Sequence, residues 1–149
     1  MGIVVVGVDG SEGAAHALDY AIKEAAIHGF RLRVVSAWEI PPSVLASVVA
    51  SKEFYEEFRN NAVAVAEEAA ARVAELEPTV EHEELVVEGQ AGKALLNNAE
   101  DADLMVVGRR GHGSFREMLL GSISRQVVVH AKCPLVIVPP PGEDQNHTK

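Results

Sequence analysis

The feature that most constrains the fold of this chain is a regular alternation of short apolar runs with longer amphipathic segments. Five runs rich in valine are separated by stretches in which apolar residues recur at helical spacing. The runs cover residues 3–8, 32–38, 85–87, 104–107 and 135–138. Short runs of this composition are typical of strands buried on both faces. The alternation predicts an α/β fold, an open and doubly wound five-stranded parallel sheet with helices on both faces.

Capping residues mark several of the predicted helix boundaries. Ser11 is placed to begin the first helix and Gly29 to end it. A long helical face recurs over residues 58–76, and residues 43–50 before it are compatible with either a loop or the start of a helix. The remaining helices are predicted around two groups of apolar residues: Ala91, Leu95 and Ala99, then Ile123, Val127 and Ala131.

Length and charge limit the class of protein. A chain of 149 residues suits one domain, which we expect over residues 1–141, followed by a polar C-terminal tail over 142–149. The net charge of −9 disfavours non-specific binding to nucleic acid, which needs basic groups to displace counterions. No apolar run approaches the ~18 residues of a membrane span, and no leader segment is recognisable. We therefore expect a cytoplasmic protein without nucleic-acid or membrane partners.

Two segments compete for the place where a ligand would bind. In an open α/β sheet, ligands bind beyond the carboxyl ends of the strands. Residues 9–11, Asp-Gly-Ser, follow the first strand, and the glycine-rich residues 108–121 follow the fourth. Glycines allow backbone N–H groups to turn towards an anion, and the helix that begins near Ser122 adds its free amides. The local pattern also fits a flexible loop followed by helix-capping serines.

The second segment departs from two common nucleotide-binding motifs. Gly108 and Gly113 have the separation of the glycines in GxxxxGK[ST], but Ser114 occupies the position of the lysine. The first segment lacks GxGxxG, which disfavours a dinucleotide site. The usual machinery of P-loop hydrolysis is therefore not supported.

Three motifs together resemble the ATP-binding type of the universal stress protein family. The spacing G-x2-G-x9-G-S runs from Gly108 to Ser122, Asp9-Gly10-Ser11 follows the first strand, and Cys133-Pro134 precedes the last. The resemblance covers residues 3–139. It implies a Rossmann-like fold of the adenine nucleotide alpha hydrolase-like type and a homodimer formed through the last strand, Leu135, Val136, Ile137 and Val138. An apolar edge strand otherwise invites uncontrolled pairing, which agrees with that implication.

The resemblance also implies a set of contacts with ATP, with magnesium held only through the nucleotide. Asp9 would contact the nucleoside, and Val8 and Ala37 would line the adenine. The glycine-rich loop would enclose the ribose and phosphates, and the following helix would hold the phosphate chain. The loop residues are Gly108, Arg109, Gly111, His112 and Gly113, and those at the helix are Gly121, Ser122, Ile123 and Ser124.

Three functions remain open from the sequence. The first is a nucleotide-dependent regulatory module of the stress response. The second is a slow ATPase or a protein that phosphorylates itself on Ser122 or Ser124, although no catalytic residue is recognisable. The third is an interaction module that binds no nucleotide. Asp9 is equally suited to a ligand contact and to an Asx turn before the helix, and His112 is interpreted as a ligand or loop residue without acid–base function.

Overall fold

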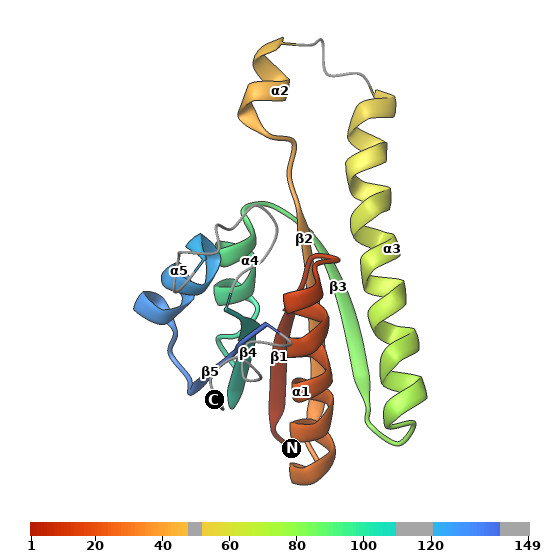
Figure 1. Ribbon diagram of the computed structural model, residues 1–149, viewed down its shortest axis with the longest axis vertical. Coiled ribbons are helices and arrows are strands. Elements are labelled where there is room, and N and C mark those ends of the chain that lie inside the picture. Colours follow the sequence, from red (N-terminus) through yellow and green to blue (C-terminus); the bar gives the residue numbers. More distant parts are fainter. Residues whose placement is uncertain (48–51, 110–120, 141–149) are drawn as a thin grey trace, which may run out of the picture.

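A computed structural model describes residues 1–47, 52–109 and 121–140 of the chain. The strands in these ranges are β1 (Ile3–Val8), β2 (Arg31–Trp38), β3 (His82–Glu88), β4 (Leu104–Gly108) and β5 (Leu135–Val138). The helices are α1 (Glu12–His28), α2 (Pro42–Ser47), α3 (Lys52–Leu76), α4 (Ala91–Asn97) and α5 (Ser122–His130). Figure 1 shows α3 and β3 at one side of the molecule and α5 and β5 at the other.

The strands form one sheet in the order β3-β2-β1-β4-β5, and all neighbouring strands are parallel. The predicted five-stranded parallel sheet is therefore confirmed. The chain first builds outwards from β1 through β2 to β3, and it then crosses to the other side of β1 to add β4 and β5. The direction of winding thus reverses between β1 and β4, which is where open α/β sheets bind ligands.

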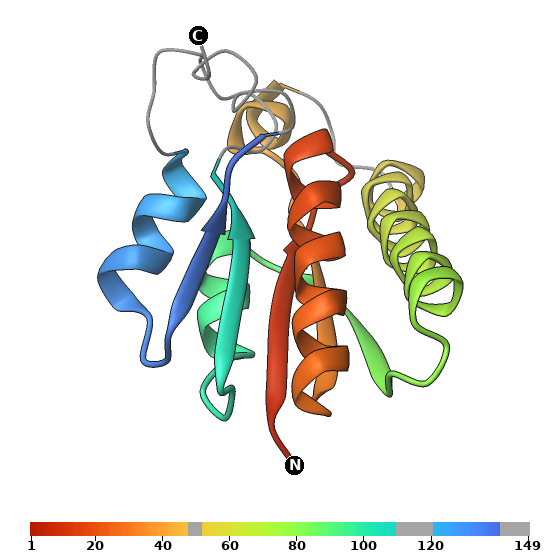
Figure 2. The ribbon, with the colours of Figure 1, turned by 60° about the horizontal axis from the view of Figure 1, so that its bottom comes forward.

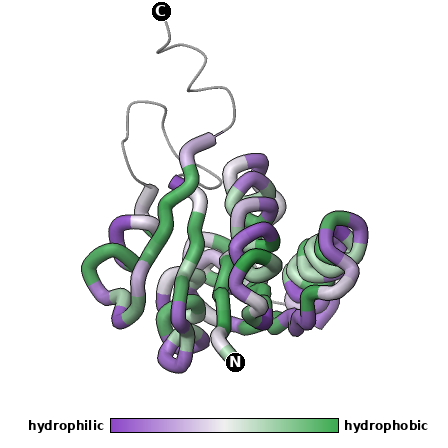
Figure 3. The backbone as a smooth tube through the Cα atoms, turned by 90° about the horizontal axis from the view of Figure 1, so that it is seen from below, coloured by the Kyte–Doolittle hydropathy of each residue, from purple (hydrophilic) through white to green (hydrophobic). Residues whose placement is uncertain are grey.

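Helices cover both faces of the sheet, as predicted (Figure 2). On one face, Val4 and Val6 of β1 pack in a core cluster with Ile22 of α1 and Val73 of α3. On the other face, Val5 shares a cluster with Leu95 of α4 and Val127 of α5. Alternate residues of β1 therefore serve opposite layers, because successive side chains of a strand point to opposite faces. Figure 3 shows the apolar residues running along the central strands.

The predicted caps of the first helix are confirmed. The Ser11 side chain accepts a hydrogen bond from the Ala14 N–H at 3.1 Å, which satisfies one of the free amides at the start of α1. Gly29 ends the helix with φ at +67°, in the left-handed region that favours glycine, and its N–H donates to the Ala25 carbonyl.

The structure differs from the sequence prediction at the bounds of β3 and α4, and it decides one segment that the sequence left open. β3 begins at His82 instead of Leu85, because its polar first half lies at the sheet edge, where Glu83 pairs with Arg33 of β2. α4 ends at Asn97, so Ala99 is buried beyond the helix. Within the ambiguous residues 43–50, the described part is helical and belongs to α2.

Candidate functional site

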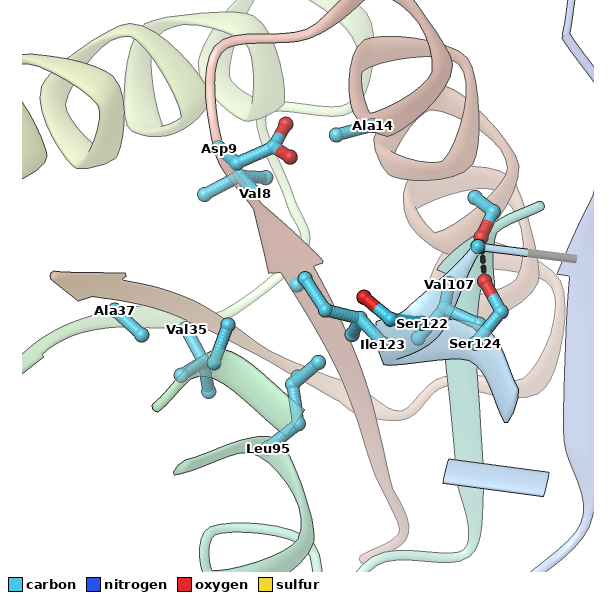
Figure 4. Close-up of a pocket in the computed structure, with 14 residues that line it drawn as sticks. Val8, Asp9, Ala14, Val35, Ala37, Leu95, Val107, Ser122, Ile123 and Ser124 are labelled. Atoms are coloured by element: carbon cyan, nitrogen blue, oxygen red, sulfur yellow. Dashed lines mark hydrogen bonds between the residues drawn. The ribbon is translucent and has the colours of Figure 1, made fainter. Parts of the chain in front are cut away.

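A pocket opens at the carboxyl edge of the sheet, directly over the β1–β4 reversal. Val8 and Asp9 reach it from the end of β1, Val107 and Gly108 from the end of β4, and the first turn of α5 completes the wall. The space that is free of atoms measures ≈ 650 Å³ and is continuous with solvent. Figure 4 shows the labelled side chains arranged around this space. Both segments singled out in the sequence therefore meet at one pocket.

Most of the sequence-predicted site residues that the structure describes line this pocket. They are Val8, Asp9, Ala37, Gly108, Gly121, Ser122, Ile123 and Ser124. Arg109 follows Gly108 directly, but its side chain is not part of the lining, and its backbone N–H donates to the Val138 carbonyl at 2.9 Å. Gly111, His112 and Gly113 lie outside the described residues.

Asp9 is held in the turn that leads from β1 into α1. One of its carboxylate oxygens, Oδ1, accepts a hydrogen bond from the Ser11 N–H at 2.9 Å, which is an Asx turn. The same half-buried side chain lines the pocket. The turn thus fixes the carboxylate at the mouth of the pocket, so the two interpretations of Asp9 from the sequence are compatible with one conformation.

Gly108 is required by close packing between β4 and α1. A Cβ atom at this position would lie 3.0 Å from the carbonyl oxygen of Gly13 and 3.4 Å from the Ala14 nitrogen. Such contacts are with backbone, which cannot rotate away as a side chain can. Glycine therefore allows the end of β4 to approach the first turn of α1 and closes one wall of the pocket.

The two serines at the start of α5 have different surroundings. Ser122 is exposed at the first position of the helix and lines the pocket. Ser124 is 3% exposed, and its hydroxyl donates to the carbonyls of Gly108 at 2.7 Å and Arg109 at 2.9 Å. Figure 4 shows one of these hydrogen bonds of Ser124 as a dashed line. Of the two hydroxyls, only that of Ser122 is presented to solvent.

Sequence reasoning missed the residues that form the apolar walls of the pocket. Val35 of β2 and Leu95 of α4 are buried residues at its base, and small residues widen it elsewhere. The remaining lining residues that were not predicted are Gly7, Ala14, Ala91 and Val107. Each lies inside a run that has the pattern of an ordinary core. One sequence signal could have identified Val35. It is two residues from the predicted site residue Ala37, and side chains two residues apart on a strand face the same side.

The described residues contain no group of three or more His, Cys, Asp or Glu side chains arranged to hold a metal ion. They also contain no helix with the length and apolar character needed to cross a membrane. The pocket offers a carboxylate, a hydroxyl, backbone amides at the start of α5 and apolar walls. This combination suits a ligand with an apolar ring and a polar, anionic end.

Comparison with known proteins finds relatives over most of the chain. A profile described as "Universal stress protein family" matches residues 1–139. A universal stress protein of Thermus aquaticus is 36% identical over 137 residues, covering 91% of this chain and 96% of the relative. The chain spans about half the length of the mycobacterial universal stress proteins that it matches.

Solved structures share the fold. A universal stress protein in complex with cAMP is 30% identical, has a TM-score of 0.71, and is matched over 93% of this chain and 97% of its own. A family protein from Arabidopsis thaliana with AMP bound is 18% identical, has a TM-score of 0.68, and is matched over 97% and 95%. The family profile extends over nearly the whole chain, and the Thermus relative is matched almost end to end. This chain therefore belongs to the universal stress protein family.

Proposed function

We infer that this protein binds an adenine nucleotide, ATP with magnesium, and acts as a nucleotide-dependent regulatory module of the stress response in the cytoplasm. One observation carries the proposal: a single pocket at the β1–β4 reversal is lined by both Asp9 and the first turn of α5. These are the two places that the sequence motifs single out. We further propose that residues 1–141 act as one nucleotide-binding domain and that 142–149 form a tail outside it.

The pocket has an apolar part and a polar part, and this division supports a nucleotide as the ligand. Val35, Leu95 and Ile123 offer apolar contacts of the kind that hold a base. The exposed Ser122 hydroxyl and the free amides at the start of α5 suit phosphate oxygens, which accept hydrogen bonds and are favoured by the helix dipole. The relative that is 30% identical binds cAMP, so a family member with this fold accepts an adenine nucleotide.

The small number of carboxylates in the pocket supports a magnesium ion that is carried by the nucleotide. Asp9 is the one carboxylate that lines the pocket among the described residues, and one of its oxygens is already engaged by the Ser11 N–H. Mg²⁺ commonly binds through one or two carboxylates together with substrate phosphates and waters. We therefore propose that the ion arrives with ATP and is held only through the phosphates of the nucleotide, while Asp9 contacts the nucleoside.

We also propose a homodimer formed through β5. Within the described residues β5 pairs with β4 and lies at the edge of the sheet. Leu135, Val136 and Ile137 are half-buried, and on the neighbouring helix α5 the side chain of Val129 is 73% exposed. Pairing two copies along β5 would bury this apolar edge.

Nucleotide binding is tested by identifying the bound molecule and by filling the pocket with a larger side chain. The small molecule released on denaturation is identified by mass spectrometry, and ATP with Mg²⁺, ADP, AMP and cAMP are titrated by calorimetry. We expect ATP to bind below millimolar concentration. Ala37→Leu should weaken binding at least about tenfold, because the longer side chain occupies the space that the base would fill.

The matched control is Ala64→Leu, which makes the same change at an exposed position of α3 and should leave the affinity unchanged. Absence of binding by the unmodified protein at millimolar ATP would reject the proposal. Equal affinities for the protein and for Ala37→Leu would place the nucleotide elsewhere.

A further inference from the structure

The hydroxyl of Ser124 joins the two chain segments on either side of the glycine-rich loop. It donates to the carbonyl oxygens of Gly108 and Arg109, at the end of β4. The Arg109 carbonyl also accepts the Gly121 N–H at 2.8 Å. The start of α5 is therefore joined to the end of β4 by the Gly121 N–H and by the Ser124 hydroxyl, whose one proton is shared between two carbonyls.

The direction of these bonds limits what Ser124 can do for a ligand. A serine hydroxyl carries a single proton, and here that proton is directed at two carbonyl oxygens. A phosphate oxygen is itself an acceptor, so it gains no hydrogen bond from an Oγ whose proton is already used. Ser124 is also 3% exposed, whereas Ser122, two residues earlier, is exposed.

The segments that Ser124 joins form adjacent parts of the pocket wall. Val107 and Gly108 form the β4 wall, and Ser122 and Ile123 form the α5 wall. The β4 wall is itself held by its neighbours, because the end of β4 packs closely on the first turn of α1 and the Arg109 N–H donates to the Val138 carbonyl. The Ser124 bonds therefore set how far α5 stands from β4.

We propose that Ser124 is a positioning residue, which sets the position of the α5 wall against β4 through the Gly108 and Arg109 carbonyls and does not bind phosphate. The proposal rests on the proposed function for its ligand, but the bonds that it concerns exist without one. Because Ile123 is carried on the same turn of α5, loss of the Ser124 hydroxyl disturbs contacts with the base as well as contacts with the phosphates.

The two serines should differ in which ligands lose affinity when the hydroxyl is removed. Adenosine, AMP and ATP are titrated by calorimetry against Ser124→Ala and Ser122→Ala. We expect Ser124→Ala to weaken all three by a similar factor, about tenfold, because two half-buried carbonyls lose a donor and the wall shifts. We expect Ser122→Ala to weaken ATP and AMP and to leave adenosine within twofold.

The same role is measured without any ligand by hydrogen exchange of the Gly121 amide, followed by NMR. Ser124→Ala should speed this exchange about tenfold, and Ser124→Thr, which keeps the hydroxyl, should restore both the exchange rate and the affinities. Ser124→Cys keeps the shape of the side chain but replaces the hydroxyl with a larger thiol that is a weak donor. It should also speed exchange, and it serves if the alanine variant fails to fold.

A loss of ATP affinity in Ser124→Ala with adenosine affinity and Gly121 exchange both unchanged would show direct phosphate contact and overturn the inference. If the unmodified protein binds none of the three compounds, the proposed function fails. The Gly121 exchange rate then still decides the role of Ser124.

Discussion

Gly7 and Leu95 show how one missing side chain keeps the pocket open. Gly7 lies in β1 between Val6 and Val8, and a Cβ atom there would lie 2.8 Å from Leu95 Cδ1 and 3.0 Å from Cδ2. Both residues line the pocket, and Leu95 is buried. The glycine lets the leucine rest directly on the strand, so the space above the strand stays free for a ligand.

Gly7→Ala is expected to push Leu95 into the pocket and to weaken nucleotide binding about tenfold. Overpacking of this kind shifts neighbouring side chains and typically costs about 1–3 kcal/mol. Calorimetry with ATP measures the effect. Gly2→Ala is a matched control, because it crowds the Phe30 ring just before β1, outside the pocket lining. Adding Leu95→Val to Gly7→Ala should recover affinity. Unchanged ATP affinity in Gly7→Ala would show that Leu95 does not border the ligand.

Prediction from sequence is weakest at the scale of single residues. The identity of Ser124 is visible in the sequence, but the direction of its proton depends on where the Gly108 and Arg109 carbonyls lie after folding. Val35 and Leu95 were missed for a related reason. Their side chains suit a core, and only the arrangement of β2 and α4 around the pocket shows that they also face its open space.

At the scale of elements, Arg33 connects three segments at the amino-terminal half of the sheet. From β2, its Nε donates to Glu83 of β3 at 2.6 Å, and its Nη1 donates to Asp101 at 2.7 Å and to the Asn98 carbonyl at 2.8 Å. The Arg33 side chain is 15% exposed, so these bonds are partly shielded from solvent. They tie the edge strand β3 and the turn before β4 to β2.

This network predicts a dependence of stability on pH. The Arg33 guanidinium, by donating hydrogen bonds to the Asp101 carboxylate, lowers the pKa of Asp101. A carboxylate with a lowered pKa in the folded state adds stability above its unfolded pKa of about 3.9, and that stability is lost as the pH falls through the folded pKa. Asp101→Asn should therefore lower the melting temperature at pH 7, and the difference from the unmodified protein should shrink only below about pH 4.

Melting curves recorded at half-unit steps of pH check this prediction. Glu100→Gln is the control, because it removes one negative charge from the neighbouring exposed position. A difference between the unmodified protein and Asp101→Asn that stays constant down to pH 2.5 would contradict the role given to the carboxylate.

Helices and strands were predictable because their signals are local. The valine-rich runs gave the strands, and Ser11 and Gly29 marked the first helix, whose caps the structure confirms. β3 was predicted too short because its first residues, His82 and Glu83, are polar. Their place in the sheet comes from pairing with Leu32 and Arg33, which are some 50 residues away along the chain and give no local signal.

At the scale of the whole molecule, the geometry of β5 makes the proposed dimer testable. The Met105 N–H of β4 donates to the Pro134 carbonyl, and the Arg109 N–H after β4 donates to the Val138 carbonyl of β5. The carbonyls of residues 134 and 138 therefore face β4. Backbone groups alternate in direction along a parallel strand, so those of Leu135 and Ile137 point away from β4, towards the outer edge.

Ile137→Pro should therefore remove an outward N–H while sparing the bonds to β4, because proline is tolerated at sheet edges. We expect a monomer by analytical ultracentrifugation, whereas Ile137→Ala, which trims the side chain but keeps the N–H, should retain more of the dimer. If Ile137→Pro still unfolds cooperatively and its dimer dissociation constant is unchanged, the two copies associate elsewhere.

The central position of β1 also has a consequence for synthesis on the ribosome. One side of β1 is covered early, by β2, but Val5 must wait for Met105, a hundred residues later, before its other side is paired. Until then a nascent chain presents an unpaired apolar strand edge, the kind of surface that chaperones protect. The pocket needs β4 and α5, so no nucleotide can assist this first stage. Any ligand that assists folding acts only on the last step, when the second half of the sheet docks.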